Sequence, residues 1–231
     1  MNSSVDSITI IRAGVLLRDP ALWYENFTDI EIRNMSLSFG ITSQPTVILV
    51  KTDGLNIIID PGWQDPGKPN RLLSDLHYFN LKPQDIDEVF ITHWHSDHWN
   101  GIFLFPEAKV FYAGIGASVV MKHLRNNSDD REPIRLSEGE DWHSGMDIIS
   151  TPGHTSHDHS VRMRWNDKMY IASGDAIVSK MYYESKTFFP NDRVDKFRDE
   201  LLASYDKIVN QADFIIPGHD APFYNYRKGK K

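Results

Sequence analysis

A short polar segment of the chain carries four side chains that could bind a metal ion. Residues 93–98 read His-Trp-His-Ser-Asp-His, so three histidines and one aspartate fall within six positions. Imidazole nitrogen and carboxylate oxygen are ligands that zinc, iron and manganese accept at catalytic sites. The largely apolar, strand-like run at 88–92 would deliver this segment to the end of a sheet, where a cleft can form. The segment therefore indicates a metal centre.

Four further segments of the same character accompany it along the chain. They read Ile-Ile-Ile-Asp-Pro-Gly at 57–62, Thr-Pro-Gly-His-Thr at 151–155, Ser-Gly-Asp at 173–175 and Pro-Gly-His-Asp at 217–220. Together with Thr-His-Trp-His-Ser-Asp-His at 92–98, they resemble the five motifs of the metallo-β-lactamase superfamily, in the family's order. The resemblance covers nearly the whole chain.

The resemblance implies a ligand set and a reaction class. The first ion would be held by His93, His95 and His154, the second by Asp97, His98 and His219, and Asp175 would bridge the two. Two divalent ions lower the pKa of a shared water far enough for hydroxide to form near neutral pH. The implied activity is that of a metal-dependent hydrolase with a dinuclear centre and a bridging hydroxide nucleophile. Zinc is the expected metal, with iron or manganese as alternatives.

Several residues beside the ligands have supporting roles in this interpretation. Asp97 is also the expected catalytic residue, because its second oxygen could orient the hydroxide and pass a proton to the leaving group. The resemblance gives Asp60 a bracing role through hydrogen bonds to the metal loop, which a strand-terminal aspartate that merely caps a turn would also fit. Many relatives carry a histidine four residues after the third ligand, where this chain has Asp158. We expect Asp158 to support a ligand histidine, and His157 and His159 to lie outside the ligand set.

The composition restricts the class of protein. With 231 residues, 25% of them charged, and a net charge of −7, the chain fits a globular protein with no general attraction for nucleic acid. It has no cysteine, which excludes disulfides and thiolate ligands and is typical of a reducing cytoplasm. No segment reaches the roughly 18–20 apolar residues that a membrane helix needs. We expect a cytoplasmic protein with a small-molecule substrate and no membrane contact. The oligomeric state is left open.

The elements that must position the motifs form two β-rich halves, each followed by helices. Strands are predicted at 7–17, 35–41, 45–51, 55–60, 88–92 and 109–112, and then at 134–137, 146–151, 160–165, 168–173 and 214–216. Helices are predicted at 70–79, 98–103, 114–124 and 194–209. Because no Gly/Ser linker separates the halves, the pattern favours one domain over 1–231 with the α/β fold of an αββα sandwich, two mixed β-sheets flanked by helices. The superfamily resemblance implies the same fold.

The charge of the motif segments bears on the substrate. Residues 91–104, 151–161 and 213–226 contain no lysine or arginine, although a phosphodiester needs basic residues near the metals. The nearest basic candidates are Lys180, Lys186, Arg12 and Arg33.

For the aromatic residues near the motifs, two functions remain open. Tyr182 or Tyr183 could donate a hydrogen bond to the oxyanion of an acyl substrate, or pack in the core. Trp63, Trp94 and Trp99 could line a pocket or stack on a base, or support the loops by ordinary packing.

Four functions remain open, in a definite order. We expect hydrolysis of a small ester, lactone or thioester. Phosphodiester or RNA cleavage comes second, because the later motifs resemble a small single-domain branch of the superfamily that is linked to that chemistry. A mononuclear iron enzyme of the persulfide dioxygenase type is third. A metal-binding scaffold without catalysis is last, since every ligand position of the family is filled.

Overall fold

Two six-stranded β-sheets form the centre of the computed structural model, which describes residues 4–16, 44–63, 71–114, 117–188 and 196–230. The first sheet runs in chain order: β1 (Ser7–Arg12), β2 (Val47–Thr52), β3 (Leu55–Ile59), β4 (Glu88–Ile91), β5 (Lys109–Ala113) and β6 (Ile134–Leu136). The strands β1 to β3 pair antiparallel, and β3 to β6 pair parallel.

The second sheet has the order β12-β11-β10-β9-β8-β7. Its strands are β7 (Asp141–His143), β8 (Met146–Ser150), β9 (His159–Trp165), β10 (Lys168–Gly174), β11 (Phe214–Pro217) and β12 (Phe223–Tyr224). Only β10 and β11 pair parallel, so both sheets are mixed.

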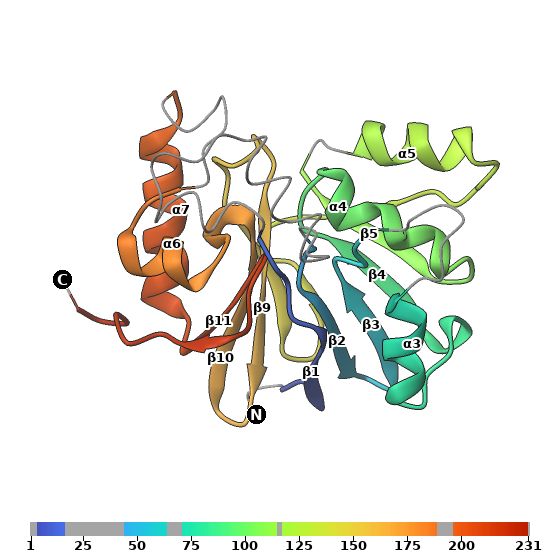
Figure 1. Cartoon of the computed structure of the whole chain (residues 1–231), viewed down its shortest axis with the longest axis horizontal. Helices are drawn as coiled ribbons and strands as arrows, with labels where there is room; N and C mark the ends of the chain where they lie inside the picture. The colour runs from blue at the N-terminus through green and yellow to red at the C-terminus, as the bar shows by residue number, and fades with distance from the viewer. Residues whose placement is uncertain (1–3, 17–43, 64–70, 115–116, 189–195, 231) are drawn as a thin grey trace, which may run out of the picture.

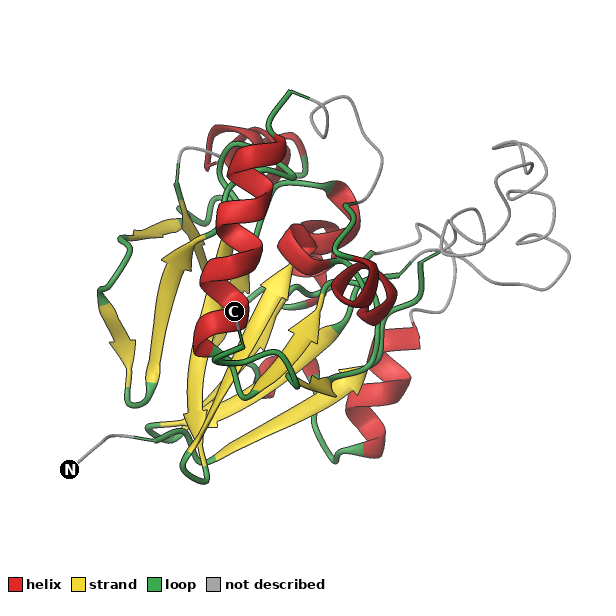
Figure 2. Ribbon diagram, turned by 90° about the vertical axis from the view of Figure 1, so that its left-hand side faces the viewer, coloured by secondary structure: helices red, strands yellow, loops and turns green. Residues whose placement is uncertain are grey.

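Helices cover the outer faces of both sheets (Figure 1). Beside the first sheet lie α3 (Arg71–Tyr78), α4 (Ser96–Trp99) and α5 (Ala117–Asn126), with 3-10 turns η1 (Pro83–Asp85) and η2 (Asn100–Leu104). Beside the second lie η3 (Asp175–Ile177), α6 (Lys180–Ser185) and α7 (Arg198–Gln211). Figure 2 shows α7 lying across the face of the second sheet. No helix in the described ranges is long and apolar enough to cross a membrane.

The apolar runs of the strands are explained by burial on both faces. Side chains alternate along a strand, so Ile57 and Ile59 of β3 pack between the two sheets, while Ile58 packs outward in the core that contains Leu72 of α3. A third core joins the outer face of the second sheet to α7 through residues such as Leu201. These three apolar layers confirm the predicted αββα sandwich.

The segments that resemble the superfamily motifs lie at one edge of the sandwich. The parallel strands β3 and β4 end directly before Asp60 and the 92–98 segment, and the parallel strands β10 and β11 end before or within the segments of Asp175 and His219. Strand β8 runs in the same direction as β10, because both pair antiparallel with β9. It therefore leads to the His154 segment at the same edge.

Two predicted elements are shorter than expected, for identifiable reasons. The strand predicted at 7–17 ends at Arg12, after which Gly14 leaves the sheet and packs against the His219 segment. The helix predicted at 98–103 begins earlier, at Ser96, and gives way after Trp99 to the 3-10 turn η2. There the Gly101 amide donates to the Gly62 carbonyl at 2.6 Å, outside the helix.

The other predicted helices and strands differ from the observed ones mainly at their ends. The helix predicted at 194–209 begins at Arg198 and runs to Gln211. The sequence patterns did not indicate β7, β12 or α6, whose lengths are three, two and six residues. The strand predicted at 35–41 lies outside the described residues.

Arg131 stabilises the segment at 102–108, which follows the loop at 92–98. Its guanidinium donates to the carbonyl oxygens of Phe105 at 2.6 Å, Ala108 at 2.9 Å and Ile102 at 3.2 Å. These three residues are fully buried. Asp129 holds the same guanidinium from the other side, at 2.6 Å.

We predict that Arg131→Ala lowers the free energy of unfolding by roughly 2–3 kcal/mol, because buried carbonyl oxygens lose a charged donor. Arg131→Lys should recover only a minor part, since an ammonium cannot reproduce the planar fork. Arg135→Ala, an exposed arginine on β6, is the matched control and should change stability by less than about 0.5 kcal/mol. Urea unfolding checks this, and equal stability of the Arg131→Ala and Arg135→Ala proteins would contradict it.

Candidate metal centre

Four potential ligand atoms from three strand ends form a first group. It comprises His93, His95, His154 and Asp175, with all four ligand atoms within 4.8 Å of one another. Nδ1 of His95 lies 3.1 Å from Nε2 of His93 and 2.9 Å from Nε2 of His154. Oδ2 of Asp175 lies 3.2 Å from the same His154 nitrogen. The group has the donor types that a divalent transition metal binds.

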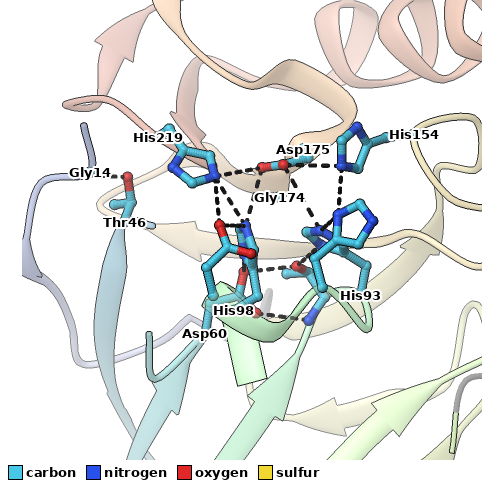
Figure 3. A network of polar contacts seen from close by, with 12 residues as sticks. Gly14, Thr46, Asp60, His93, His98, His154, Gly174, Asp175 and His219 are labelled. Atoms are coloured by element: carbon cyan, nitrogen blue, oxygen red, sulfur yellow. Dashed lines mark hydrogen bonds and ion pairs between the residues drawn. The ribbon is translucent and has the colours of Figure 1, made fainter. Parts of the chain in front are cut away.

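Asp97, His98 and His219 form a second group, also within 4.8 Å. The Nε2 atoms of His98 and His219 are 3.2 Å apart, and Oδ2 of Asp97 lies 3.5 Å from the latter. Asp175 faces this group with its other oxygen: Oδ1 is 3.3 Å from His98 Nε2 and 3.5 Å from His219 Nε2. Figure 3 shows the Asp175 carboxylate between His219 and His154. One carboxylate is thus shared by both groups.

Hydrogen bonds behind the rings determine which nitrogen faces the centre. Nδ1 of His98 donates to Oδ2 of Asp60 at 2.8 Å, and Nδ1 of His219 donates to the Gln44 carbonyl at 2.9 Å. Nδ1 of His93 lies 3.1 Å from the Thr92 hydroxyl. A proton held on Nδ1 leaves Nε2 with its lone pair, which is the form that coordinates a metal.

Asp60 braces the metal-binding loop through three hydrogen bonds. Besides His98, its carboxylate accepts the Thr92 amide at 2.9 Å and the Thr92 hydroxyl at 2.7 Å, and the residue is buried. Its backbone has φ 52°, in the left-handed region that aspartate and asparagine tolerate better than most residues. The side chain is thereby turned from the end of β3 toward β4, and the predicted bracing role matches this geometry.

The charges in the centre suit cation binding. Burial, together with the neighbouring His98, places the pKa of His93 well below its usual range, and burial lowers the pKa of His154 to about 4. Burial opposes the charge of Asp175, yet His219, His98 and His154 outweigh it and hold the pKa of this carboxyl well below its usual value. Burial also opposes the charge of His98 and His219, yet Asp175 outweighs it and raises the pKa of both imidazoles. Neutral imidazoles at His93 and His154 and an ionised Asp175 are the states that ligate a metal, whereas metal binding at His98 and His219 would release protons.

A buried oxygen supplies a test of the fit. Oδ1 of Asp175 accepts no hydrogen bond from the described residues, although it is shielded from solvent. Such an atom is costly unless a partner satisfies it. The nearest groups are the two imidazole Nε2 atoms of the second group, which also face each other. A cation between these three atoms would satisfy all of them, so the residues fit a bound metal.

Gly14 and Thr46, which precede β2, contact the His219 segment closely. Thr46 accepts the Gly14 amide at 3.1 Å (Figure 3) and donates its hydroxyl to the Asp220 carbonyl at 2.8 Å. A Cβ added at Gly14 would lie 2.6 Å from the His219 Cα, so only glycine allows this approach. Gly218 is similar, because its added Cβ would lie 2.1 Å from Oδ1 of Asp175. Sequence reasoning missed Gly14, Gln44 and Thr46, which no motif marks.

All seven predicted ligands lie in the two groups, and their metal binding stays a prediction. His157 and His159 lie outside both groups, and Nδ1 of His159 donates to the His157 carbonyl at 2.9 Å. Asp158 accepts the amide of Thr155 at 2.6 Å and also its hydroxyl, so it braces the turn that follows His154.

The predicted aromatic and basic candidates are placed as follows. Tyr183 is buried and donates to the Asn225 side chain at 2.8 Å, which is a packing role, whereas Tyr182 lines a small cavity beside His154 and Asp175. Lys180, Lys186 and Arg12 pair with Glu184, Asp206 and Asp75, respectively. Arg33 lies outside the described residues.

Comparison with known proteins shows the family. The sequence model of the metallo-beta-lactamase superfamily matches residues 40–219, so the chain belongs to this superfamily. The mouse protein metallo-beta-lactamase domain-containing protein 1 is 29% identical over 177 residues, which are 76% of this chain and 63% of the mouse protein. A protein of Methanocaldococcus jannaschii described as a probable metallo-hydrolase is 32% identical over 168 residues, 73% of this chain and 72% of that protein.

A solved structure supports the fold. A quorum-quenching N-acyl homoserine lactone lactonase superposes with a TM-score of 0.68 at 17% identity, over 95% of this chain and 94% of the lactonase. Family, fold and side-chain cluster together identify the chain as a member of the metallo-β-lactamase superfamily with a candidate metal site.

We predict that Asp60→Asn weakens metal binding at the second group by about 10–100-fold. Asparagine tolerates the positive φ, but its amide would present an N–H to Nδ1 of His98 and drive the ring proton to Nε2, where it blocks the ligand lone pair. Competition with a chromophoric chelator measures the affinity. Asp87→Asn, which alters a carboxylate beside the opposite ends of β3 and β4, should bind metal as the unmodified chain does. Unchanged affinity in Asp60→Asn would refute this role.

Proposed function

We propose that this chain is a dinuclear metallohydrolase, with zinc as the native metal, that acts on a small ester, lactone or thioester. The observation that supports the proposal best is the shared carboxylate. Asp175 directs Oδ2 toward His154 and Oδ1 toward His98 and His219, so a single side chain serves both ligand groups. A mononuclear site would need no second group of ligands around it.

Each part of the centre has a defined task in such a reaction. When bound, two divalent ions supply hydroxide near neutral pH and polarise the substrate oxygen. Asp60 and the Gln44 carbonyl keep the rings of His98 and His219 in the ligating tautomer. Asp97, whose side chain is 32% exposed, is the acidic member that solvent and substrate reach, so it can hold a proton and deliver it to the leaving group.

The surroundings favour an acyl substrate over a phosphodiester. The segments around the centre carry no lysine or arginine, and the described basic candidates nearest to it are paired with carboxylates. A phosphodiester is an anion and spreads further charge over several oxygens during cleavage, so it needs positive groups that these segments do not offer. The fold similarity to a lactone-hydrolysing protein is consistent with the same substrate class.

The metal content tests the dinuclear centre. The purified protein should carry about two transition-metal ions per chain, since both ligand groups are complete. His95→Ala should lose about one ion and nearly all hydrolysis, whereas His157→Ala, altering a histidine outside both groups, should keep both ions. Elemental analysis by mass spectrometry gives the count. Trace metal after incubation with excess zinc would refute the proposal, and one iron per chain with oxygen consumption would favour the dioxygenase type.

The substrate class is tested by comparing acyl and phosphoryl compounds. We expect kcat/KM for lactones, esters or thioesters to exceed that for bis-p-nitrophenyl phosphate and RNA, with weak dependence on salt, because no counterions need to be released. The assays use the zinc-loaded chain at low and high sodium chloride, with the His95→Ala protein as the blank for contaminating enzymes. Faster cleavage of RNA that is slowed steeply by salt and by Lys180→Ala would reverse the ranking.

A further inference from the structure

Trp94 is an exposed aromatic side chain in the middle of the metal-binding loop. It stands between two ligands of the first group, His93 and His95, and 39% of its surface is exposed. The centroid of its ring lies 5.2 Å from that of His95, with the planes inclined at 65°. The indole therefore contacts a candidate ligand directly and remains open to solvent.

The position of Trp94 is fixed by its neighbour in the short helix. Trp99 is buried, its ring lies 4.5 Å from that of His123, and its indole N–H donates to the Trp94 carbonyl at 2.8 Å. The backbone of Trp94 is thus tied to the outer core of the first sheet. The indole itself stays exposed beside His95, so it offers an apolar surface next to the candidate centre.

The centre is open to solvent on the side of Trp94. His93, His98, His154, Asp175 and His219 are buried, whereas His95 and Asp97 are partly exposed. A substrate reaches the ligand groups past these two side chains, and Trp94 adjoins His95 there.

The inner side of the centre offers little room. The described cavity beside His154 and Asp175 is lined further by Ile177, Tyr182 and Leu201, and it has a volume of about 10 Å³. Such a volume holds about one water molecule. This cavity therefore cannot take up an acyl chain, whereas the exposed indole of Trp94, beside the partly exposed His95, can be covered by one.

The charge around Trp94 indicates what can lie on it. No lysine or arginine occurs from 91 to 104, and the partly exposed carboxylate of Asp97 follows three residues after Trp94 in the sequence. An uncharged apolar chain gains by covering the indole, whereas a nucleobase would bring phosphate groups beside that carboxylate.

We propose that Trp94 is a specificity-determining residue, the apolar surface against which the acyl or alkyl chain of the substrate packs while its carbonyl lies at the metal centre. This rests on the proposed acyl-hydrolase function. It adds to that function a substrate class: esters or lactones with a medium-length, uncharged, unbranched chain.

A series of γ-lactones with unbranched alkyl substituents of increasing length tests the proposal on the zinc-loaded full chain. Wild-type kcat/KM should rise roughly twofold for each of the first few methylenes. This factor corresponds to about half of the free energy gained when a methylene is completely buried. This rise in kcat/KM should come from a lower KM. Trp94→Ala should flatten the dependence, and Trp94→Phe should keep most of it. Tyr78→Ala, which removes another exposed aromatic ring, on α3, should match the wild type at every length.

Binding without turnover separates this proposal from the hydrolase proposal. The matching γ-lactams, which resist hydrolysis, should bind the zinc-loaded wild type more tightly as the chain lengthens, but should bind Trp94→Ala with little dependence on length. If no lactone or ester is hydrolysed while the lactams show this pattern, the hydrolase proposal fails and the apolar surface stands. An equal long-to-short ratio in wild type and folded Trp94→Ala overturns the inference, as does Trp94-dependent binding of oligonucleotides in place of lactams.

Discussion

The buried carboxylate of Asp175 is the group on which the rest of the centre depends. Burial opposes its charge, and the histidines of both ligand groups, led by His219 and His98, outweigh that penalty and keep its pKa well below the usual value. The first sheet supplies His98, while the second supplies His154, Asp175 and His219. An ionised Asp175 without these partners would be costly. Docking of the two sheets therefore brings Asp175 together with its partner His98.

The cost of placing these side chains is offset by contacts outside the ligand groups. Asp60 adopts a positive φ, which three hydrogen bonds to Thr92 and His98 stabilise. On the opposite side, Gly14 packs against the His219 segment at a distance that permits no Cβ, and Thr46 hydrogen-bonds to both Gly14 and Asp220. The rings are thus held from behind by groups that touch no substrate, and the centre is preorganised by the fold itself.

The sequence predicted what depends on local pattern and little of what depends on close approach between distant segments. The strand-like run before residues 93–98 predicted that this segment lies at the end of a sheet, and the resemblance of the five motifs to the superfamily implied one edge of an αββα sandwich. The contact between Gln44 and His219 joins residues 175 positions apart and has no local signal. The end of α4 follows from the Gly101–Gly62 hydrogen bond, which is equally non-local. Trp94 and Trp99 are identical as residues, and only packing separates the exposed one from the buried one.

The substrate specificity of the centre depends on side chains outside the ligand groups. The ligand groups alone do not distinguish acyl from phosphoryl substrates, since both reactions use hydroxide and a polarised oxygen. The distinction has to come from side chains at the open side of the centre. In the described part of the chain these include the partly exposed Asp97 and the exposed Trp94. The basic residues Arg12, Lys180 and Lys186 each pair with a carboxylate. Under the proposed acyl-hydrolase function the bound ions would attract either substrate. An acyl substrate would then be selected by the apolar surface of Trp94 and by the lack of lysine and arginine in the segments around the centre.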